Sequence, residues 1–381
     1  MSASPSERPN FENKRNLAKT LLKRIKAGED YAALRLTWNH PRFKGKSAQD
    51  VFSAVPTLAD CQLTIAKESG FESWGRLKNY VEQLDTDPNG PIARFEHAVR
   101  CLIHGDAREL AAALHTHPHL ATVRSPRSHR CVLLHYVAAN GVENEHQKTP
   151  ANIVEIAQLL FRCGADAVVD ATADIYGGGP GSTPLVGLVT SCHPAEAGAQ
   201  AELVRVFCAA GANVNGIEED GLPLACALAF RYPAAAEALK SCGARLDNLV
   251  FAAALGEETL VADMLRQPES SWKNFPNPFP GQKSPLDTPQ TIAEQAFIYA
   301  CMSGQLATAQ ALLAHGVNIN AGPNRGATAL HESAYQGNLA MVRFLLANGA
   351  DRTLCDQQWK STPAQWAAWN DHTGVARECS Q

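Results

Sequence analysis

Cysteine motifs, long apolar runs and abundant aromatic side chains are all missing from this chain. Aromatic residues make up only 7% of the 381 residues and charged residues 19%, whereas hydrophobic residues reach 45%. This composition excludes wholesale disorder, because enough apolar side chains are present to build a core. Alanine is abundant, and a core of small residues indicates helices that pack closely together.

The cysteines are spaced too widely for a zinc knuckle or a redox pair. Eleven are present, an odd number, and no two lie closer than 16 residues, so no C-x-x-C pair occurs. A disulfide framework is not expected either, and we predict reduced, mostly buried thiols.

Membrane and export signals are missing as well. No run of about 18 apolar residues occurs, so no transmembrane helix is predicted. The segment from Met1 to Arg15 is polar and lacks the apolar region of a signal peptide. These observations predict a soluble, cytoplasmic protein with no membrane partner.

Charge is nearly balanced but unevenly distributed. The net charge is −4, yet residues 1–85 carry 14 basic and 10 acidic side chains and the remainder carries 20 and 28. The basic side chains between Lys14 and Lys26 lack interleaved aromatics, so we interpret them as a solvated helix face. Nucleic acid is therefore not expected as a partner.

A repeat of 33 residues is visible near the C-terminus. Gly304 and Gly337 are 33 residues apart, as are Gly316 and Gly349, and the leucine pair at Leu312 recurs at the same spacing. Three coinciding offsets indicate repeated structural units.

The repeated residues resemble the ankyrin repeat, whose pattern is T-P-L-H-x-A, a short helix, a glycine turn and a second helix. Thr328–His331 nearly matches its start, and Thr362-Pro363 and Thr183-Pro184 open further units. The Gly-Ala-Asp or Gly-Ala-Asn exits follow at Gly164, Gly211 and Gly349.

This resemblance implies an all-α ankyrin-repeat solenoid over residues 92–381, with about seven repeats and a C-terminal half-repeat. We place the starts near residues 96, 132, 183, 222, 247, 295 and 328, and the half-repeat from 362. Residues 1–91 are predicted to be a helical N-terminal cap with a linker. The run Leu58–Lys78 resembles a segment that often precedes ankyrin arrays in bacterial proteins.

Departures from the repeat pattern are where function is expected, since insertions become loops on one face. Long insertions are predicted near residues 142–153 and 192–200, side by side. Two extended fingers, Asp170–Gly181 and Trp272–Gly281, are expected to project along the rim of the concave groove. That groove is where the resemblance implies partner binding.

Two functions remain open at this stage. The first is a non-catalytic binding or scaffold protein that recognises a protein partner through its concave face and long finger loops. The alternative is an enzyme or small-molecule-binding protein with a pocket around repeats two to four. The candidate ligand or partner contacts are His135, Tyr136, Asp174, Tyr176, His193 and Tyr232.

No catalytic residue, metal ligand or cofactor site is predicted. No G-x-S-x-G occurs, and the adjacent Cys192 and His193 do not by themselves define a dyad. The histidines between His115 and His119 lack a nearby carboxylate or cysteine, so no metal site is expected. The resemblance implies that His135 and His331 make structural hydrogen bonds. Trp359, Trp366 and Trp369 are interpreted as sealing the last repeat.

Overall fold

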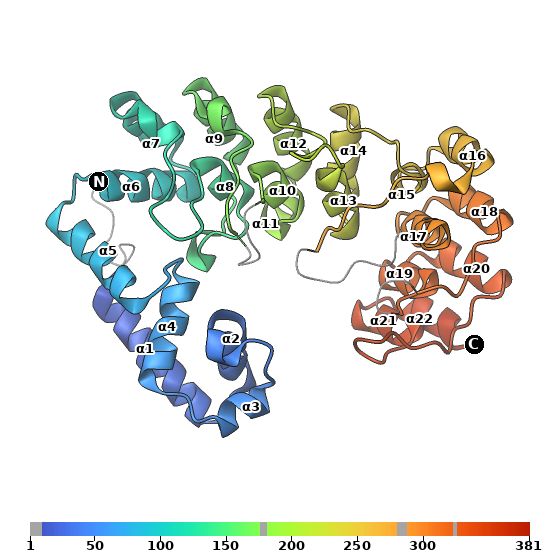
Figure 1. The fold of residues 1–381 in the computed structure, drawn as a ribbon, viewed down its shortest axis with the longest axis horizontal. Helices are drawn as coiled ribbons and strands as arrows, with labels where there is room; N and C mark the ends of the chain where they lie inside the picture. The colour runs from blue at the N-terminus through green and yellow to red at the C-terminus, as the bar shows by residue number, and fades with distance from the viewer. Residues whose placement is uncertain (1–9, 176–180, 280–287, 323–325) are drawn as a thin grey trace. The chain divides into compact units, whose positions relative to one another are not determined.

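The computed structural model describes residues 10–175, 181–279, 288–322 and 326–381, and it is helical throughout (Figure 1). Within these residues, strand-like pairing is limited to one antiparallel bridge between Ala173 and Ser182. The all-α prediction is therefore confirmed. No helix in the described residues is long and apolar enough to cross a membrane. The chain divides into two compact units, Met1–Ala199 and Gln200–Gln381.

Five α-helices and one short 3-10 helix open the described part of the first unit. Thr57 and Asp60 form a capping box, which satisfies the free N–H groups at the start of the fourth helix. Leu21, Ile25 and Leu36 are buried in a shared apolar core. The elements are α1 Phe11–Lys26, α2 Asp30–Asn39, η2 Pro41–Phe43, α3 Ala48–Ser53, α4 Leu58–Glu68 and α5 Trp74–Thr86.

The remainder of the first unit contains paired helices with inserted segments. The hydroxyl of Ser191 donates to the carbonyl of Ala139 at 3.1 Å, and the Asn140 amide donates to Thr190 Oγ1 at 2.8 Å. The two predicted insertions therefore begin side by side. The elements are α6 Pro91–His104, α7 Ala107–Thr116, η3 Pro118–Ala121, α8 Leu133–Ala138, η4 Asn144–His146, α9 Ile153–Arg162, η5 Ala165–Val168, α10 Pro184–Val189 and α11 Cys192–Glu196.

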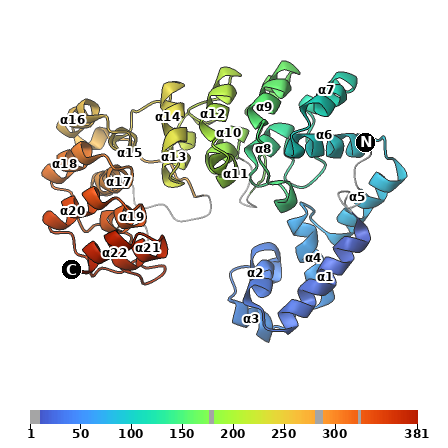
Figure 2. The ribbon, with the colours of Figure 1, turned by 180° about the vertical axis from the view of Figure 1, so that it is seen from behind.

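The second unit continues with helices that stack as successive pairs (Figures 1 and 2). Two helices follow Thr362. The elements are α12 Gln200–Ala209, α13 Leu222–Ala229, α14 Pro233–Ser241, α15 Leu249–Ala254, α16 Glu258–Arg266, η6 Glu269–Ser271, α17 Pro289–Met302, α18 Leu306–Ala314, α19 Ala329–Tyr335, α20 Leu339–Ala347, α21 Pro363–Trp369 and α22 Thr373–Ser380.

The histidine of the Leu-His motif ties one repeat to the next. Nδ1 of His331 accepts from the Thr328 hydroxyl at 2.9 Å, and Nε2 donates to the Ser361 carbonyl at 3.1 Å. Nδ1 of His135 accepts from the backbone N–H of Val132, and Nε2 donates to the carbonyl of Ser182. The expected structural role of both histidines is therefore seen directly.

The turn glycine of the repeat is required by both backbone and space. Gly337 has φ +70°, and a Cβ at this position would lie 2.6 Å from Nδ1 of His372 in the next repeat. A side chain here would be strained and would push adjacent repeats apart.

Residues 272–279 of the aromatic finger after α16 fold back onto their own unit instead of projecting, and residues 280 and 281 of that finger lie outside the described residues. Phe275 is buried, with its ring centroid 5.6 Å from Phe251 and 4.9 Å from Tyr299. The Trp272 indole donates to the carbonyl of Met264 at 3.0 Å. This corrects the expectation of a free aromatic finger: burying large apolar rings outweighs extending them into solvent.

The three C-terminal tryptophans separate into one buried and two exposed side chains. Trp366 is 9% exposed, and its indole donates to Asp356 at 3.1 Å, whereas Trp359 and Trp369 are 62% and 85% exposed. The ring of His331 packs against Trp366 with centroids 5.2 Å apart. The capping prediction therefore holds for Trp366, while the other two tryptophans offer exposed apolar surface.

Trp366→Ala should lower the free energy of unfolding by about 3 kcal/mol, because a large buried aromatic is lost and a cavity remains. Trp369→Ala should change it by less than about 0.5 kcal/mol, because that side chain is exposed. Urea denaturation followed by circular dichroism compares the two variants. Equal losses in both would show that Trp366 does not seal the array.

Candidate functional site

An open groove with a volume of about 900 Å³ lies in the first unit. One wall comes from α2, η2 and α4, and the other from the segment after α8 together with Asp174. The groove therefore joins the N-terminal helices to the segment after α8 and to the segment that holds Asp174. Both of these repeat-side segments were singled out in the sequence because they exceed the normal repeat length.

An exposed aromatic pair forms part of the N-terminal wall. Helix α2 buries Ala32, Ala33 and Leu36 on one side. Its other side presents Tyr31 and Trp38, which are 61% and 60% exposed and meet edge to face with ring centroids 5.8 Å apart. Exposed aromatic rings at the wall of a groove supply the rigid contact area that dominates many protein interfaces.

The charges of this wall are partly paired. The Arg35 guanidinium makes two parallel hydrogen bonds to Glu68, at 2.8 and 2.6 Å, so their charges offset each other. Lys44 and Lys67 also line the groove and are exposed. Asp174 is the exposed acid on the opposite wall. The groove thus has cations on one side and a carboxylate on the other.

A cluster of buried charged groups adjoins the groove, and two of its members, His129 and Glu143, belong to the groove lining. Arg127 contacts Glu143 at 2.5 Å and Glu96 at 2.9 Å, and all three side chains are almost completely enclosed. The Tyr80 hydroxyl donates to Glu96. Because Tyr80 lies on α5, Glu96 on α6 and Glu143 ahead of α9, the cluster holds α5 and α6 against the segment that precedes α9.

Two histidines complete this cluster. His129 Nε2 lies 2.7 Å from Glu143 Oε1, and His146 Nδ1 lies 2.9 Å from the other carboxylate oxygen. Nδ1 of His129 accepts from the backbone N–H of Cys131 at 3.1 Å, so the proton resides on Nε2 and is donated to Glu143. The structure thereby selects one neutral tautomer of His129.

The cluster is unsuited to acid–base catalysis. Burial alone raises the pKa of the Glu143 carboxyl, but the charge of Arg127 and the hydrogen bonds from His129 and His146 outweigh it. They hold the pKa well below its usual range. A carboxylate that stays ionised and fully engaged is a poor proton acceptor near neutral pH. We therefore assign the cluster a structural role.

The structure distributes the predicted contact residues over several environments. Asp174 lines the groove, whereas His135 and Tyr136 are completely buried in α8 and form no part of its wall. Helix α8 is buried on all sides, so none of its side chains, including His135 and Tyr136, reaches the groove wall. His193 is partly buried on α11, outside the groove lining.

The remaining two predicted residues are Tyr176 and Tyr232. Tyr176 lies outside the described residues. Tyr232 caps α14 in the second unit, where it is partly buried. The structure therefore places Asp174, of the six candidates, in the groove.

Sequence reasoning missed Tyr31 and Trp38. The spacing i, i+4 and i+7 of residues 31, 35 and 38 places all three on one helix face, which the sequence alone could have indicated. Tyr31 and Trp38 are exposed, however, only because α2 packs against the core through Ala32, Ala33 and Leu36.

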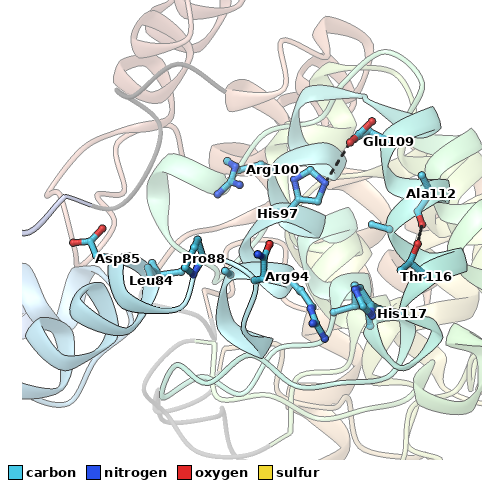
Figure 3. A pocket seen from close by; sticks show the side chains of 14 residues that line it. Leu84, Asp85, Pro88, Arg94, His97, Arg100, Glu109, Ala112, Thr116 and His117 are labelled. Carbon is cyan, nitrogen blue, oxygen red and sulfur yellow. Dashed lines mark hydrogen bonds and ion pairs between the residues drawn. The ribbon is translucent and has the colours of Figure 1, made fainter. Parts of the chain in front are cut away.

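A second open pocket, of about 510 Å³, lies between the end of α5 and the pair α6–α7 (Figure 3). His97 and Cys101 stand 3.7 Å apart beside it. Burial raises the pKa of the Cys101 thiol to about 11, so the thiolate needed for a nucleophile does not form near neutral pH.

In the part of the chain that the structure describes, no three His, Cys, Asp or Glu side chains are grouped to hold a metal ion. The rings of His117 and His119 are 5.9 Å apart and meet edge to face.

Comparison with known families identifies part of the chain. Residues 249–356 and 297–378 match the ankyrin repeats (3 copies) family. This match confirms the ankyrin prediction for residues 249–378, and for residues 92–248 the assignment stays a prediction. No curated protein matches the chain. Ankyrin repeats are typical protein-interaction modules, and no enzyme family is found.

Proposed function

We propose that this is a non-catalytic binding protein, which holds a segment of a protein partner in the groove of its first unit. The observation that carries the proposal is the exposed Tyr31–Trp38 pair on the groove wall. Isolated exposed aromatics are common, but two rings in contact beside a groove form a ready anchor site.

The charges and the loops around the groove support the same function. Lys44 and Lys67 face a wall that carries Asp174, so a bound segment with side chains of both signs finds a complementary surface. In this proposal residues 1–91 act as the helical cap, and residues 92–381 form the repeat array.

The alternative, an enzyme or small-molecule pocket around repeats two to four, has less support. His135 and Tyr136 offer no surface to a ligand, and Glu143 is held in ion pairs. The groove instead presents rings, amides and exposed charges, which suit recognition without chemistry.

A cytoplasmic setting is part of the proposal. The cysteine pattern supports it, because Cys192 and Cys355 are exposed and surface thiols persist in a reducing compartment. Six further cysteines are buried.

The double variant Tyr31→Ala/Trp38→Ala should lose its partner while keeping its fold. Both rings are exposed, so their removal costs little stability, but loss of an aromatic anchor weakens an interface by 2 kcal/mol or more, about 30-fold. Affinity capture from an extract of the producing cells, with quantitative mass spectrometry, measures retention of each bound protein.

Trp369→Ala is the matched control, since it removes a similarly exposed tryptophan from the second unit. A protein captured by wild type and by the control but not by the double variant supports the groove. If instead the control loses the partner and the double variant keeps it, the binding surface lies at the C-terminal repeat.

A further inference from the structure

Basic side chains gather at the pocket of about 510 Å³ beside α6 (Figure 3). Arg94, His97 and Arg100 follow one another at intervals of three residues along α6, and His117 faces them from the end of α7. Residues spaced by three lie on one side of a helix, so the three α6 side chains form a stripe along the pocket.

Arg94 and Arg100 differ from the other partly buried arginines of this unit. Arg24 and Arg35 each bind a carboxylate, and Arg124 donates to two backbone carbonyls. Within the described residues, the guanidinium groups of Arg94 and Arg100 have neither an ion pair nor a hydrogen bond to protein. Each guanidinium group carries five N–H donors, so these two side chains have donors that a ligand can use.

The acids of the pocket do not neutralise the end formed by Arg94 and His117. Glu109 is the partner of His97, at 3.8 Å. Figure 3 shows Asp85 at the opposite side of the pocket from Arg94 and His117. One end of the pocket therefore holds positive charge and hydrogen-bond donors without a carboxylate of its own.

We propose that this pocket binds a small phosphate ester, with the phosphate between Arg94 and His117 and the ester body extending toward Leu84 and Pro88. Guanidinium groups match phosphate oxygens in geometry and charge. The volume lies within the range of small-molecule sites, and the apolar side chains supply surface for a compact ring. Arg100 lines the same pocket and adds a second cation.

The electrostatics of His117 agree with an anion at this position. Burial and the nearby positive charge of Arg94 lower the pKa of His117. An anion between the two side chains replaces this repulsion with two attractions.

Phenyl phosphate is the direct probe, because it joins a phosphate to a compact apolar ring. Isothermal titration calorimetry at low salt should show one site per chain, with tighter binding than inorganic phosphate. Arg94→Gln should weaken binding at least tenfold, because it removes a charge-assisted contact. Arg100→Gln should weaken it less, since Arg100 is the accessory cation.

Arg108→Gln is the matched control. Arg108 is exposed on the neighbouring helix α7 and does not line the pocket, so the variant makes the same change in net charge nearby. Its affinity should stay within twofold of wild type. Absence of binding to the wild-type chain, or equal weakening by Arg108→Gln and Arg94→Gln, would overturn the proposal.

A phosphotyrosine-containing pentapeptide separates a free small molecule from a phosphorylated protein segment. It should bind no tighter than phenyl phosphate, because the pocket holds the ester itself. Binding more than tenfold tighter would overturn the small-molecule source. Neither outcome depends on the groove, since Tyr31 and Trp38 lie outside this pocket.

Discussion

Arg127→Met should lower the free energy of unfolding of the first unit by about 3–5 kcal/mol. Arg127 is 3% exposed and neutralises Glu96 and Glu143, so its removal leaves two buried carboxylates without their cation. Breaking a buried ion pair by removing one member typically costs this much. Urea denaturation followed by circular dichroism measures the change.

Companion substitutions separate the ion pairs from simple packing. The double variant Arg127→Met/Glu143→Met should recover part of the loss, because apolar side chains can replace a buried pair at little cost. Arg130→Ala, at an exposed position nearby, should stay within about 0.5 kcal/mol of wild type. A stability of Arg127→Met within 1 kcal/mol of wild type would show that the cluster does not hold α5 and α6 against the segment that precedes α9.

Acidification should destabilise the protein in two stages. Burial lowers the pKa of His135 from 6.5 to about 4. Between these pH values the imidazole is protonated in the unfolded chain and neutral in the folded chain. Stability is therefore undiminished above pH 6.5 and falls as the pH drops toward 4, by about 3 kcal/mol for this group.

The other buried groups act in the same direction. Burial also lowers the pKa of His331, which adds to the loss below pH 6.5. The pKa of Glu143 is held well below 4.5, so its stabilising contribution is present above that value and disappears as the carboxylate becomes protonated at lower pH. Denaturation midpoints measured from pH 7 to pH 3 test both stages.

His135→Gln is the control for the first stage. It should be less stable than wild type at pH 7, because the bonds from Val132 and to Ser182 are weakened. Its stability should nevertheless fall less steeply between pH 6.5 and pH 4. A flat wild-type profile over this interval would contradict the assignment of buried neutral histidines.

The repeat architecture could be predicted from sequence because each repeat uses the same residue types at its helix starts and turns. Thr328 and Thr362 mark helix starts, and Gly337 marks a turn that only a residue without Cβ fits. The same logic predicted a buried Trp366. The boundary at residue 91 stays a prediction, although α5 and α6 are separate helices on either side of it.

The buried cluster could not be predicted, because its partners are distant in sequence. Arg127 meets Glu96 31 residues before it and Glu143 16 residues after it, and no spacing rule for helices links such positions. From sequence, Arg127 stands in an unremarkable loop between repeats. Only the packing of α5 and α6 onto that loop encloses it.

Contact residues are harder to predict from sequence than the fold, because the exposure of a side chain depends on tertiary packing. His135 and Tyr136 are polar residues on a helix that is buried on all sides, whereas Tyr31 and Trp38 are aromatic residues left outside a small core. From residue type alone, His135 would be expected at the surface and Trp38 in the core.

The most direct test of partner binding in the groove is site-specific photo-crosslinking from position 38 in the producing cells. A photoreactive amino acid in place of Trp38 should yield a discrete protein adduct, and the adduct should weaken when Asp174 is changed to Lys, which reverses the charge of the opposite wall. The same amino acid in place of Trp369, which is 85% exposed in the second unit, should not yield this adduct. Adducts from position 369 with none from position 38 would contradict a partner in the groove.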